Sequence, residues 1–431
     1  MLHSQITLLG KRRFLPLFIT QSLGAFNDNL FKNALVILIT FELAARSGSD
    51  PRLMVTAAAG IFILPFFLFS ATAGQLADRY DKARVIRLVK LIEIVLMLGA
   101  ALGFYLQNAS YLLFILFLMG AQSAFFGPLK YAILPDHLAR DELISGNGLI
   151  QAATFLSILL GTLVGGLFIL TSSGSTVVSI VLVFLATAGW LASRAIPATA
   201  CAAPELKVRL NFLVETWSMI AYGASHREIF RPTLAVSWFW LVGATFLAQL
   251  PTFCKLSLAG DEGLVTLLLL VFTVGIGTGS LLCNRLLRGR IHLKYVPFGA
   301  LGISLFALEL YFASAGGPPV QAEEAVDVSR FLSGWGGWRI LLDMFLIALS
   351  GGVYIVPLNA VIQARSEQAH RARNIATVNI LNALFMVASA VASALLLALD
   401  FTVPQLFLIL ALCNLGAVLF TAEMRRSDAW R

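Results

Sequence analysis

The chain has 431 residues, of which 58% are hydrophobic and 13% are charged, and its mean hydropathy is +0.85. Soluble domains carry about 25% charged residues, so this composition excludes an ordinary soluble protein and indicates a chain that folds in lipid. The net charge of +8 is better explained by membrane topology than by nucleic-acid binding, so no nucleic-acid partner is expected. The four cysteines lack metal-type spacing, and we expect no disulfide framework, metal or cofactor.

Apolar windows of about 20 residues predict twelve membrane spans. The basic residues Lys11, Arg12 and Arg13 stand directly before the first window, which is typical of an uncleaved start-inside signal. The expected spans are residues 14–44, 53–77, 85–106, 110–134, 145–171, 176–196, 230–256, 263–287, 293–314, 337–363, 372–399 and 404–423.

Charge asymmetry orients these spans. Most of the 31 lysines and arginines fall in the loops that lie on the same side as Met1. By the positive-inside rule that side is the cytoplasm, so the sequence predicts a multi-pass protein with both termini cytoplasmic.

The spans group into two halves that repeat. We expect an N-terminal six-helix bundle at residues 1–198, a cytoplasmic linker with a surface helix at 199–229, and a C-terminal six-helix bundle at 230–431. Leu206, Leu210, Leu213 and Trp217 recur at helical spacing in the linker, which favours a helix lying at the membrane interface. Similar Pro-Leu segments at 128–129 and 357–358 suggest parallel repeats. The predicted fold class is an all-α polytopic membrane protein with two pseudo-symmetric bundles.

Residues 24–33 place an unusual run of polar side chains inside the first span. One Asp or Lys at a helix centre costs about 2.5–3.5 kcal/mol even on mild insertion scales. At 100° per residue, Gln21, Ala25, Asp28 and Lys32 lie within about 60° of one another. Two interpretations remain open: a buried ion pair between Asp28 and Lys32 that fixes this helix to its neighbours, or a charged wall of a transport cavity.

Residues 74–84 resemble the loop 2–3 signature of the major facilitator superfamily. Gly74 would allow close helix approach, and Asp78 could accept from a helix N-terminus or from an arginine. The resemblance implies that Gly74, Asp78, Arg79 and Arg84 act in gating. The family's later glycine is Asp81 here, which puts the geometry of that turn in question.

Residues 24–33 and 125–131 together resemble the bacterial lysophospholipid transporter (LplT) family, closest to the form fused to acyltransferase and acyl-ACP synthetase domains. This resemblance covers essentially the whole chain. It implies a flippase-like facilitator in the bacterial inner membrane that moves lysophosphatidylethanolamine and related lysophospholipids from the outer to the inner leaflet for reacylation. Membrane lipids are expected partners. No acyltransferase follows the last span, so a separate acyltransferase/acyl-ACP synthetase, or a further part of a longer chain, would supply that step.

This substrate would need a carboxylate, a cation, amides and an apolar wall. Asp28 could hold the ammonium, and Lys32 or Lys130 the phosphate. For the amides, the other interpretation is that they hold helices together. The amide candidates are Gln21, Asn29, Gln122, Asn147 and Gln151.

Two other functions remain. One is a proton-coupled transporter of a small amphipathic solute or drug in the same superfamily, with Glu309 and Asp343 as proton carriers. The other is a membrane acyltransferase or scaffold, which lacks support because His137 and Asp141 do not have the spacing of the acyltransferase motif. There is no glycine-rich nucleotide loop, so an ATP-driven pump is not expected. No His–Cys or His–Asp cluster typical of a nucleophile is present either, so no enzyme is expected.

Overall fold

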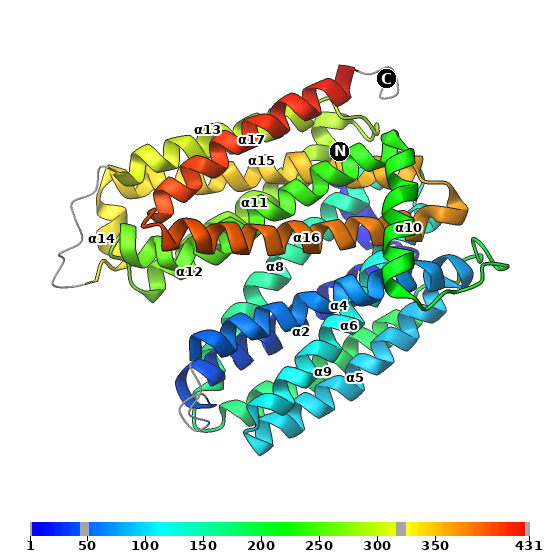
Figure 1. Ribbon diagram of the computed structural model, residues 1–431, viewed down its shortest axis with the longest axis horizontal. Helices are drawn as coiled ribbons and strands as arrows, with labels where there is room; N and C mark the ends of the chain where they lie inside the picture. The colour runs from blue at the N-terminus through cyan, green and yellow to red at the C-terminus, as the bar shows by residue number, and fades with distance from the viewer. Residues whose placement is uncertain (1, 44–50, 316–324, 427–431) are drawn as a thin grey trace. The chain divides into compact units, whose positions relative to one another are not determined.

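The computed structural model describes residues 2–43, 51–315 and 325–426 (Figure 1). Each of the twelve expected spans coincides with a long helix. These helices are α2 (Leu15–Leu38), α4 (Pro51–Arg79), α5 (Lys82–Leu106), α6 (Ala109–Ala132), α8 (Leu143–Ile169), α9 (Gly174–Arg194), α11 (Arg227–Ser257), α12 (Glu262–Leu287), α13 (Val296–Ala315), α15 (Trp335–Arg365), α16 (Arg371–Ala398) and α17 (Val403–Arg426). The shorter elements are α1 (Leu2–Leu9), η1 (Ile39–Leu43), α7 (Leu134–His137), α10 (Phe212–Ser225), α14 (Val328–Ser333) and η2 (Gln368–His370).

Within the described residues, ten helices are long and apolar enough to cross a membrane. The two expected spans outside this set are α2 and α5. Both carry charged or amide side chains that lower their hydropathy: Asn27, Asp28, Asn29, Lys32 and Asn33 on α2, and Lys82, Arg84, Arg87, Lys90 and Glu93 on α5. These two helices therefore depend on protein partners for their polar groups.

The chain forms two compact units. The first comprises Met1–Gly146, Leu156–Phe230 and Ile362–Ala383, and the second comprises Asn147–Phe155, Arg231–Val361 and Leu384–Arg431. The start of α16 thus belongs to the first unit although it lies late in the sequence. The expected domain boundaries at 198 and 230 stay a prediction.

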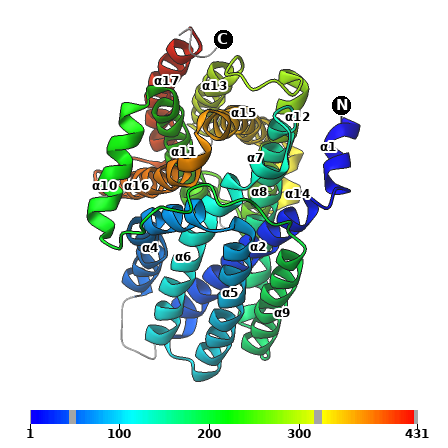
Figure 2. The same ribbon diagram turned by 90° about the vertical axis from the view of Figure 1, so that its right-hand side faces the viewer.

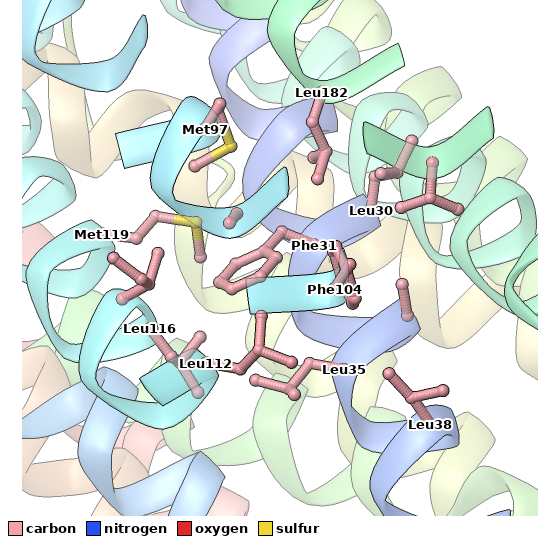
Figure 3. Packing of buried hydrophobic residues seen from close by; sticks show 14 of the residues in the cluster. Leu30, Phe31, Leu35, Leu38, Met97, Phe104, Leu112, Leu116, Met119 and Leu182 are labelled. Atoms are coloured by element: carbon pink, nitrogen blue, oxygen red, sulfur yellow. The ribbon is translucent and has the colours of Figure 1, made fainter. Parts of the chain in front are cut away.

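The first unit is built around an apolar core between α2, α5, α6 and α9 (Figure 3). Phe31 of α2 meets Phe104 of α5 edge to face, with ring centroids 5.8 Å apart, and both side chains are buried. Met97, Met119 and Leu182 fill the space around them. This core holds α2 rigidly, and α2 carries the polar residues 24–33.

Glycines let α8 approach α2 closely. A methyl group at Gly165 would lie 2.6 Å from the Leu30 carbonyl oxygen, and one at Gly161 would collide with the Phe26 carbonyl oxygen. Only glycine leaves room for this backbone contact, which is how membrane helices gain van der Waals attraction without a hydrophobic driving force.

The same helix pairings recur in the two units. In the first, α4 packs on α6 and α5 packs on α9, and Figure 2 shows these four helices side by side. In the second, α13 packs on α17, and the glycine face of α12 lies against the α15 backbone, where a methyl group at Gly275 would lie 2.5 Å from the Phe345 carbonyl oxygen. This correspondence agrees with the parallel repeats predicted from the sequence.

Glu142, just before α8, is bonded to the basic residues that directly precede α2. It accepts hydrogen bonds from Lys11 at 2.9 Å and from Arg13 at 2.7 Å. Burial favours the neutral carboxyl, but the Ala139 backbone N–H and the two cations outweigh it, so the pKa of Glu142 lies below its usual range. The basic residues that were predicted to orient the chain also anchor its first span.

The segment after α9 is bonded to the end of α4. The Thr199 backbone N–H donates to Asp81 at 2.9 Å, and the Ala203 N–H donates to the Asp78 carbonyl oxygen at 2.8 Å. Gln75 exchanges two hydrogen bonds with the Arg209 backbone, at 2.8 and 3.2 Å. The helix α10 follows, as expected for the linker.

Replacing Gly165 with alanine tests the contact between α2 and α8. The added methyl group forces the two backbones apart, so we expect a loss of about 1–3 kcal/mol. Gly60 on α4 is the matched control, because a methyl group there meets no atom within 4 Å and alanine favours a helix by about 1 kcal/mol. Thermal unfolding in detergent measures both variants, and a rise in unfolding temperature for both would contradict a tight contact.

Candidate functional site

The polar residues 24–33 of α2 have different partners. Gly24 makes room for Lys90 of α5, because a methyl group at Gly24 would collide with the Lys90 ammonium. Asn27 is fully buried and donates to Glu93 Oε1 at 3.2 Å. Asn33 donates to the Thr162 carbonyl oxygen of α8 at 2.6 Å. These three α2 positions therefore hold the bundle together.

The buried ion pair of this region is Lys90 with Glu93. The ammonium lies 2.6 Å from Glu93 Oε2, and both residues are 1% exposed. Gln122 of α6 donates to the same oxygen at 2.9 Å, and the Lys90 ammonium lies 4.5 Å from the centre of the Phe126 ring. The pair is thus satisfied by hydrogen bonds from α2 and α6 in addition to its own charges.

Asp28 is linked to this pair through α6. Its side chain is partly exposed, and its carboxylate accepts from the Ser123 hydroxyl at 2.7 Å. The same hydroxyl lies 3.3 Å from Gln122 Oε1, and Gln122 bonds Glu93. A polar chain therefore runs from the partly exposed Asp28 carboxylate to the buried Glu93.

One of the two interpretations of residues 24–33, an ion pair between Asp28 and Lys32, does not occur among the described residues. The Lys32 ammonium donates to Asn29 at 3.0 Å and lies 5.4 Å from the Phe62 ring centre, while Asp28 turns to Ser123. The reason is that α6 offers the carboxylate a hydroxyl partner that helical spacing within α2 cannot reveal. Asp28 still acts electrostatically on both Lys32 and Lys130.

Four of the expected substrate residues are partly exposed on α2 and α6 in the first unit: Asp28, Asn29, Lys32 and Lys130. Gln21 and Gln122 lie in the same unit but are buried, at 1% and 6% exposed.

The remaining two expected substrate residues, Asn147 and Gln151, lie on the part of α8 that belongs to the second unit. They are 1% and 2% exposed. Their place in a common site stays a prediction.

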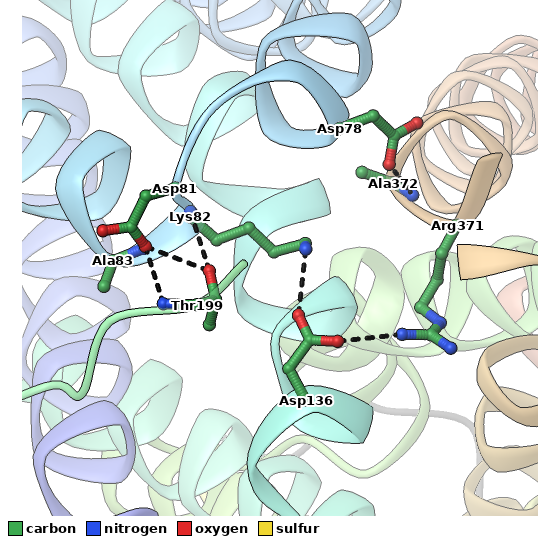
Figure 4. Close-up of polar contacts among 8 residues, drawn as sticks. All are labelled: Asp78, Asp81, Lys82, Ala83, Asp136, Thr199, Arg371 and Ala372. Atoms are coloured by element: carbon green, nitrogen blue, oxygen red, sulfur yellow. Dashed lines mark hydrogen bonds and ion pairs between the residues drawn. The ribbon is translucent and has the colours of Figure 1, made fainter. Parts of the chain in front are cut away.

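At the other end of the first unit, Asp78 caps α16. Its fully buried carboxylate accepts from the backbone N–H of Ala372 at 2.9 Å (Figure 4). It also accepts from the backbone N–H of Arg373 at 3.3 Å and from the Arg373 side chain at 3.0 Å. Gly74 completes the contact, because a methyl group there would lie 2.8 Å from the Ala376 side chain. We call Gly74, Asp78, Ala372 and Arg373 the α4–α16 contact.

Neighbouring charges reinforce this contact. Asp136 of α7 accepts from Lys82 at 2.9 Å and from Arg371 at 3.1 Å, so it joins α5 to the start of α16 (Figure 4). Asp81, which replaces the family's glycine, is the N-cap of α5 and accepts from Ala83 at 3.0 Å. Its φ of −57° is open to any residue, so the turn needs no glycine here.

The other two expected gating residues lie apart from Asp78. The Arg79 guanidinium lies 5.2 Å from the Tyr80 ring centre. Arg84 lies 3.6 Å from Asp81, and its side chain is 83% exposed. Exposed pairs of this kind contribute little to stability.

The sequence places Glu93 one turn from Lys90, which predicts a shallow ion pair between them. That pair is present, but it is buried and not shallow. Sequence reasoning missed the hydroxyl of Ser123 and the bridging position of Asp136. Ser123 and Asp136 carried no usable signal, because their partners lie on helices that are remote in sequence.

Comparison with known proteins places this geometry in a family. The family model described as Major Facilitator Superfamily matches residues 17–390. The chain is 26% identical over 374 residues to the lysophospholipid transporters LplT of Salmonella gallinarum and Salmonella typhimurium, covering 85% of this chain and 84% of each relative. These relatives are thus close to this chain in length, and a closer similarity to a fused form stays a prediction.

Solved structures share the fold. A human organic anion transporter matches with a TM-score of 0.71 at 14% identity, covering 95% of this chain and 99% of that one. A bacterial homologue of the iron transporter ferroportin, in an outward-facing state, matches with a TM-score of 0.68 at 14% identity, covering 95% and 98%. At this identity the likeness concerns the fold alone.

Replacing Glu93 tests how much the buried Lys90–Glu93 pair contributes to stability. Glu93→Gln leaves the Lys90 ammonium unpaired, and we expect a loss of about 3–5 kcal/mol in stability. The double variant Lys90→Met with Glu93→Gln removes both charges and should recover most of that loss. Unfolding in detergent provides the double-mutant cycle, with Arg84→Met as an exposed-pair control expected to cost under about 1 kcal/mol. Additive losses from Lys90→Met and Glu93→Gln would contradict the pairing.

Proposed function

The chain belongs to the major facilitator superfamily, and on that basis we propose that it transports lysophospholipids, chiefly lysophosphatidylethanolamine. The direction is from the outer to the inner leaflet of a bacterial inner membrane, with both chain termini in the cytoplasm. The similarity to LplT proteins over most of both chains supports this substrate class.

One observation carries the proposal: opposite charges lie close together on α2 and α6 and are only partly covered. Lysophosphatidylethanolamine has one phosphate anion, one ammonium and one acyl chain. Asp28 holds the ammonium, and Lys32 or Lys130 holds the phosphate, because these partly exposed side chains carry the opposite charges that the two groups need. Asn29 supplies an amide beside Lys32.

Residues that border these charged side chains have a supporting role. The Ser123 hydroxyl donates to the Asp28 carboxylate and contacts Gln122, and Gln122 donates to Glu93, so the two residues position Asp28. Gln21 of the first unit belongs to the proposed site as a further polar group, while the roles of Asn147 and Gln151 stay predictions from the sequence. The chain acts as a transporter and not as an enzyme, and an acyltransferase/acyl-ACP synthetase, either separate or in a further part of a longer chain, consumes the product.

The α4–α16 contact acts as a gate in this proposal. The start of α16 packs in the first unit through Asp78 and Gly74, so breaking these bonds releases α16 from α4. Arg79 and Arg84 act beside this gate at the membrane surface, where they face anionic headgroups.

The proposed function is tested by the movement of labelled lysophosphatidylethanolamine between leaflets of proteoliposomes, read with a membrane-impermeant quencher. We expect Asp28→Asn to slow movement about tenfold or more, because a hydrogen bond to a charged group contributes about 1.5–3 kcal/mol. Asp141→Asn changes an exposed carboxylate before α8 and serves as the control. Near-normal movement with Asp28→Asn would remove Asp28 from the site, and no movement with the unmodified protein would overturn the function.

A second variant tests the gate. Asp78→Asn weakens the cap of α16, so we expect transport to slow about tenfold while equilibrium binding of lysophosphatidylethanolamine changes less than about twofold. Arg140→Gln, an exposed change in a nearby loop, is the control. A large loss of binding with unchanged turnover would contradict the gating role.

A second function, proton-coupled transport of a small amphipathic solute, is favoured by Asp343 in the second unit. Its side chain is 3% exposed, and its Oδ2 has no hydrogen-bond partner within the described residues. Glu309, by contrast, is paired with Arg339.

A protonophore separates the two functions. Lysophosphatidylethanolamine carries no net charge, so the membrane potential does no work on it, and we expect its movement to survive the protonophore. Collapse of movement would favour proton coupling through Asp343.

A further inference from the structure

The helix α10 is apolar on two opposite sides. Met219 and Gly223 face the first unit, where Met219 packs in a cluster with Ala71 of α4 and Ala376 of α16. The opposite side is formed by Leu213, Val214 and Trp217, which are 69%, 55% and 72% exposed. At 100° per residue these three side chains span about 100°. An apolar helix face is normally covered, so the exposed side needs an apolar environment.

The depth of α10 shows what that environment is. Ala71 precedes Arg79, the last residue of α4, by eight residues, which corresponds to about 12 Å along the helix. Phe67, which packs against the same cluster, lies about 18 Å from that end. The span Met54–Arg79 is about 39 Å long, and a hydrocarbon core is about 30 Å thick. The helix α10 therefore touches α4 inside the span and not beyond it.

Its direction fits the same conclusion. In Figure 1, α10 runs across α4 and not alongside it. A helix that crosses a span at this depth lies in the plane of the membrane surface, so the side turned away from α4 faces lipid. The lipid-facing surface of the spans thus continues onto Leu213, Val214 and Trp217.

Charges at the start of α10 match a phospholipid surface. Lys207 and Arg209 are exposed directly before the helix, and Arg209 lies 3.6 Å from Glu215, which is turned inward. Basic residues favour anionic headgroups, and tryptophan is enriched where headgroups meet acyl chains.

We propose that α10 is an interfacial helix that embeds Leu213, Val214 and Trp217 in the phospholipid leaflet on the Arg79 side of the membrane, with Lys207 and Arg209 at anionic headgroups. Because α10 also touches α16 near Thr377, where a methyl group at Gly223 would lie 3.7 Å away, the helix connects the leaflet to the α4–α16 contact. This inference holds whatever substrate the protein carries.

Spin labelling of the full chain in liposomes with anionic lipid tests the proposal. The exposed cysteines Cys201 and Cys413 are first replaced with serine, while Cys254 and Cys283 are buried. A label on Trp217→Cys should be several-fold more accessible to oxygen, which partitions into lipid, than to a water-soluble nickel chelate. The matched control is Ser218→Cys, which is also exposed but lies 100° around the helix on its polar edge. This label should be more accessible to the nickel chelate than the label at position 217.

Two outcomes would overturn the proposal. Nickel accessibility at position 217 equal to that at 218 would place this face in water, open to a soluble partner. Exclusion of both reagents, with dipolar coupling between labels, would identify a second copy of the chain as the occupant.

A second measurement needs no label. Lipids brominated along the acyl chain should quench a larger share of tryptophan fluorescence in the unmodified protein than in Trp217→Phe, and equal fractional quenching would overturn the proposal. Circular dichroism confirms that both proteins are folded.

Discussion

A charge held inside a membrane must be satisfied by protein, and in the first unit the Lys90–Glu93 pair determines where the neighbouring side chains lie. Gly24 leaves room for the ammonium, and Asn27 and Gln122 supply the hydrogen bonds that the pair still needs. The polar stretch of α2 is therefore divided between two roles. Its inward residues hold three helices together, and this fixed frame presents the partly exposed Asp28 at one defined place.

The sequence predicted the spans well because apolar windows and charge asymmetry are local signals. All twelve expected spans are helices, including α2 and α5 with their charged side chains. The site was predicted only in part. Residues 24–33 stood out because polar groups are costly in lipid. Of the two interpretations left open, the pair between Asp28 and Lys32 does not form, because the partner of Asp28 is Ser123, 95 residues away. Helical spacing identifies neighbours on one helix, whereas partners across helices depend on how the bundle packs.

The α4–α16 contact was likewise predicted only in part: the motif indicated the role of Asp78, but not which helix it bonds. The motif indicated that Asp78 accepts hydrogen bonds from a helix end or an arginine, and the structure supplies both from the start of α16. The corresponding position in the second half of the sequence is Cys283, whose sulfur lies 4.0 Å from the Val353 carbonyl oxygen. A buried thiol is a weak donor and offers no charge to a helix N-terminus. The two halves thus share their helix pairings, but Cys283 in the second half cannot provide the charged cap that Asp78 provides in the first.

The network around Glu93 also has a consequence for how the chain enters the membrane during synthesis. The helix α2 is synthesised before its partners on α5 and α6, because it precedes them in the chain. In lipid alone, Asn27 and Asp28 would have no such partners. The polar groups of α2 are therefore satisfied in lipid only once α5 and α6 are in place, which makes these three helices a cooperative group.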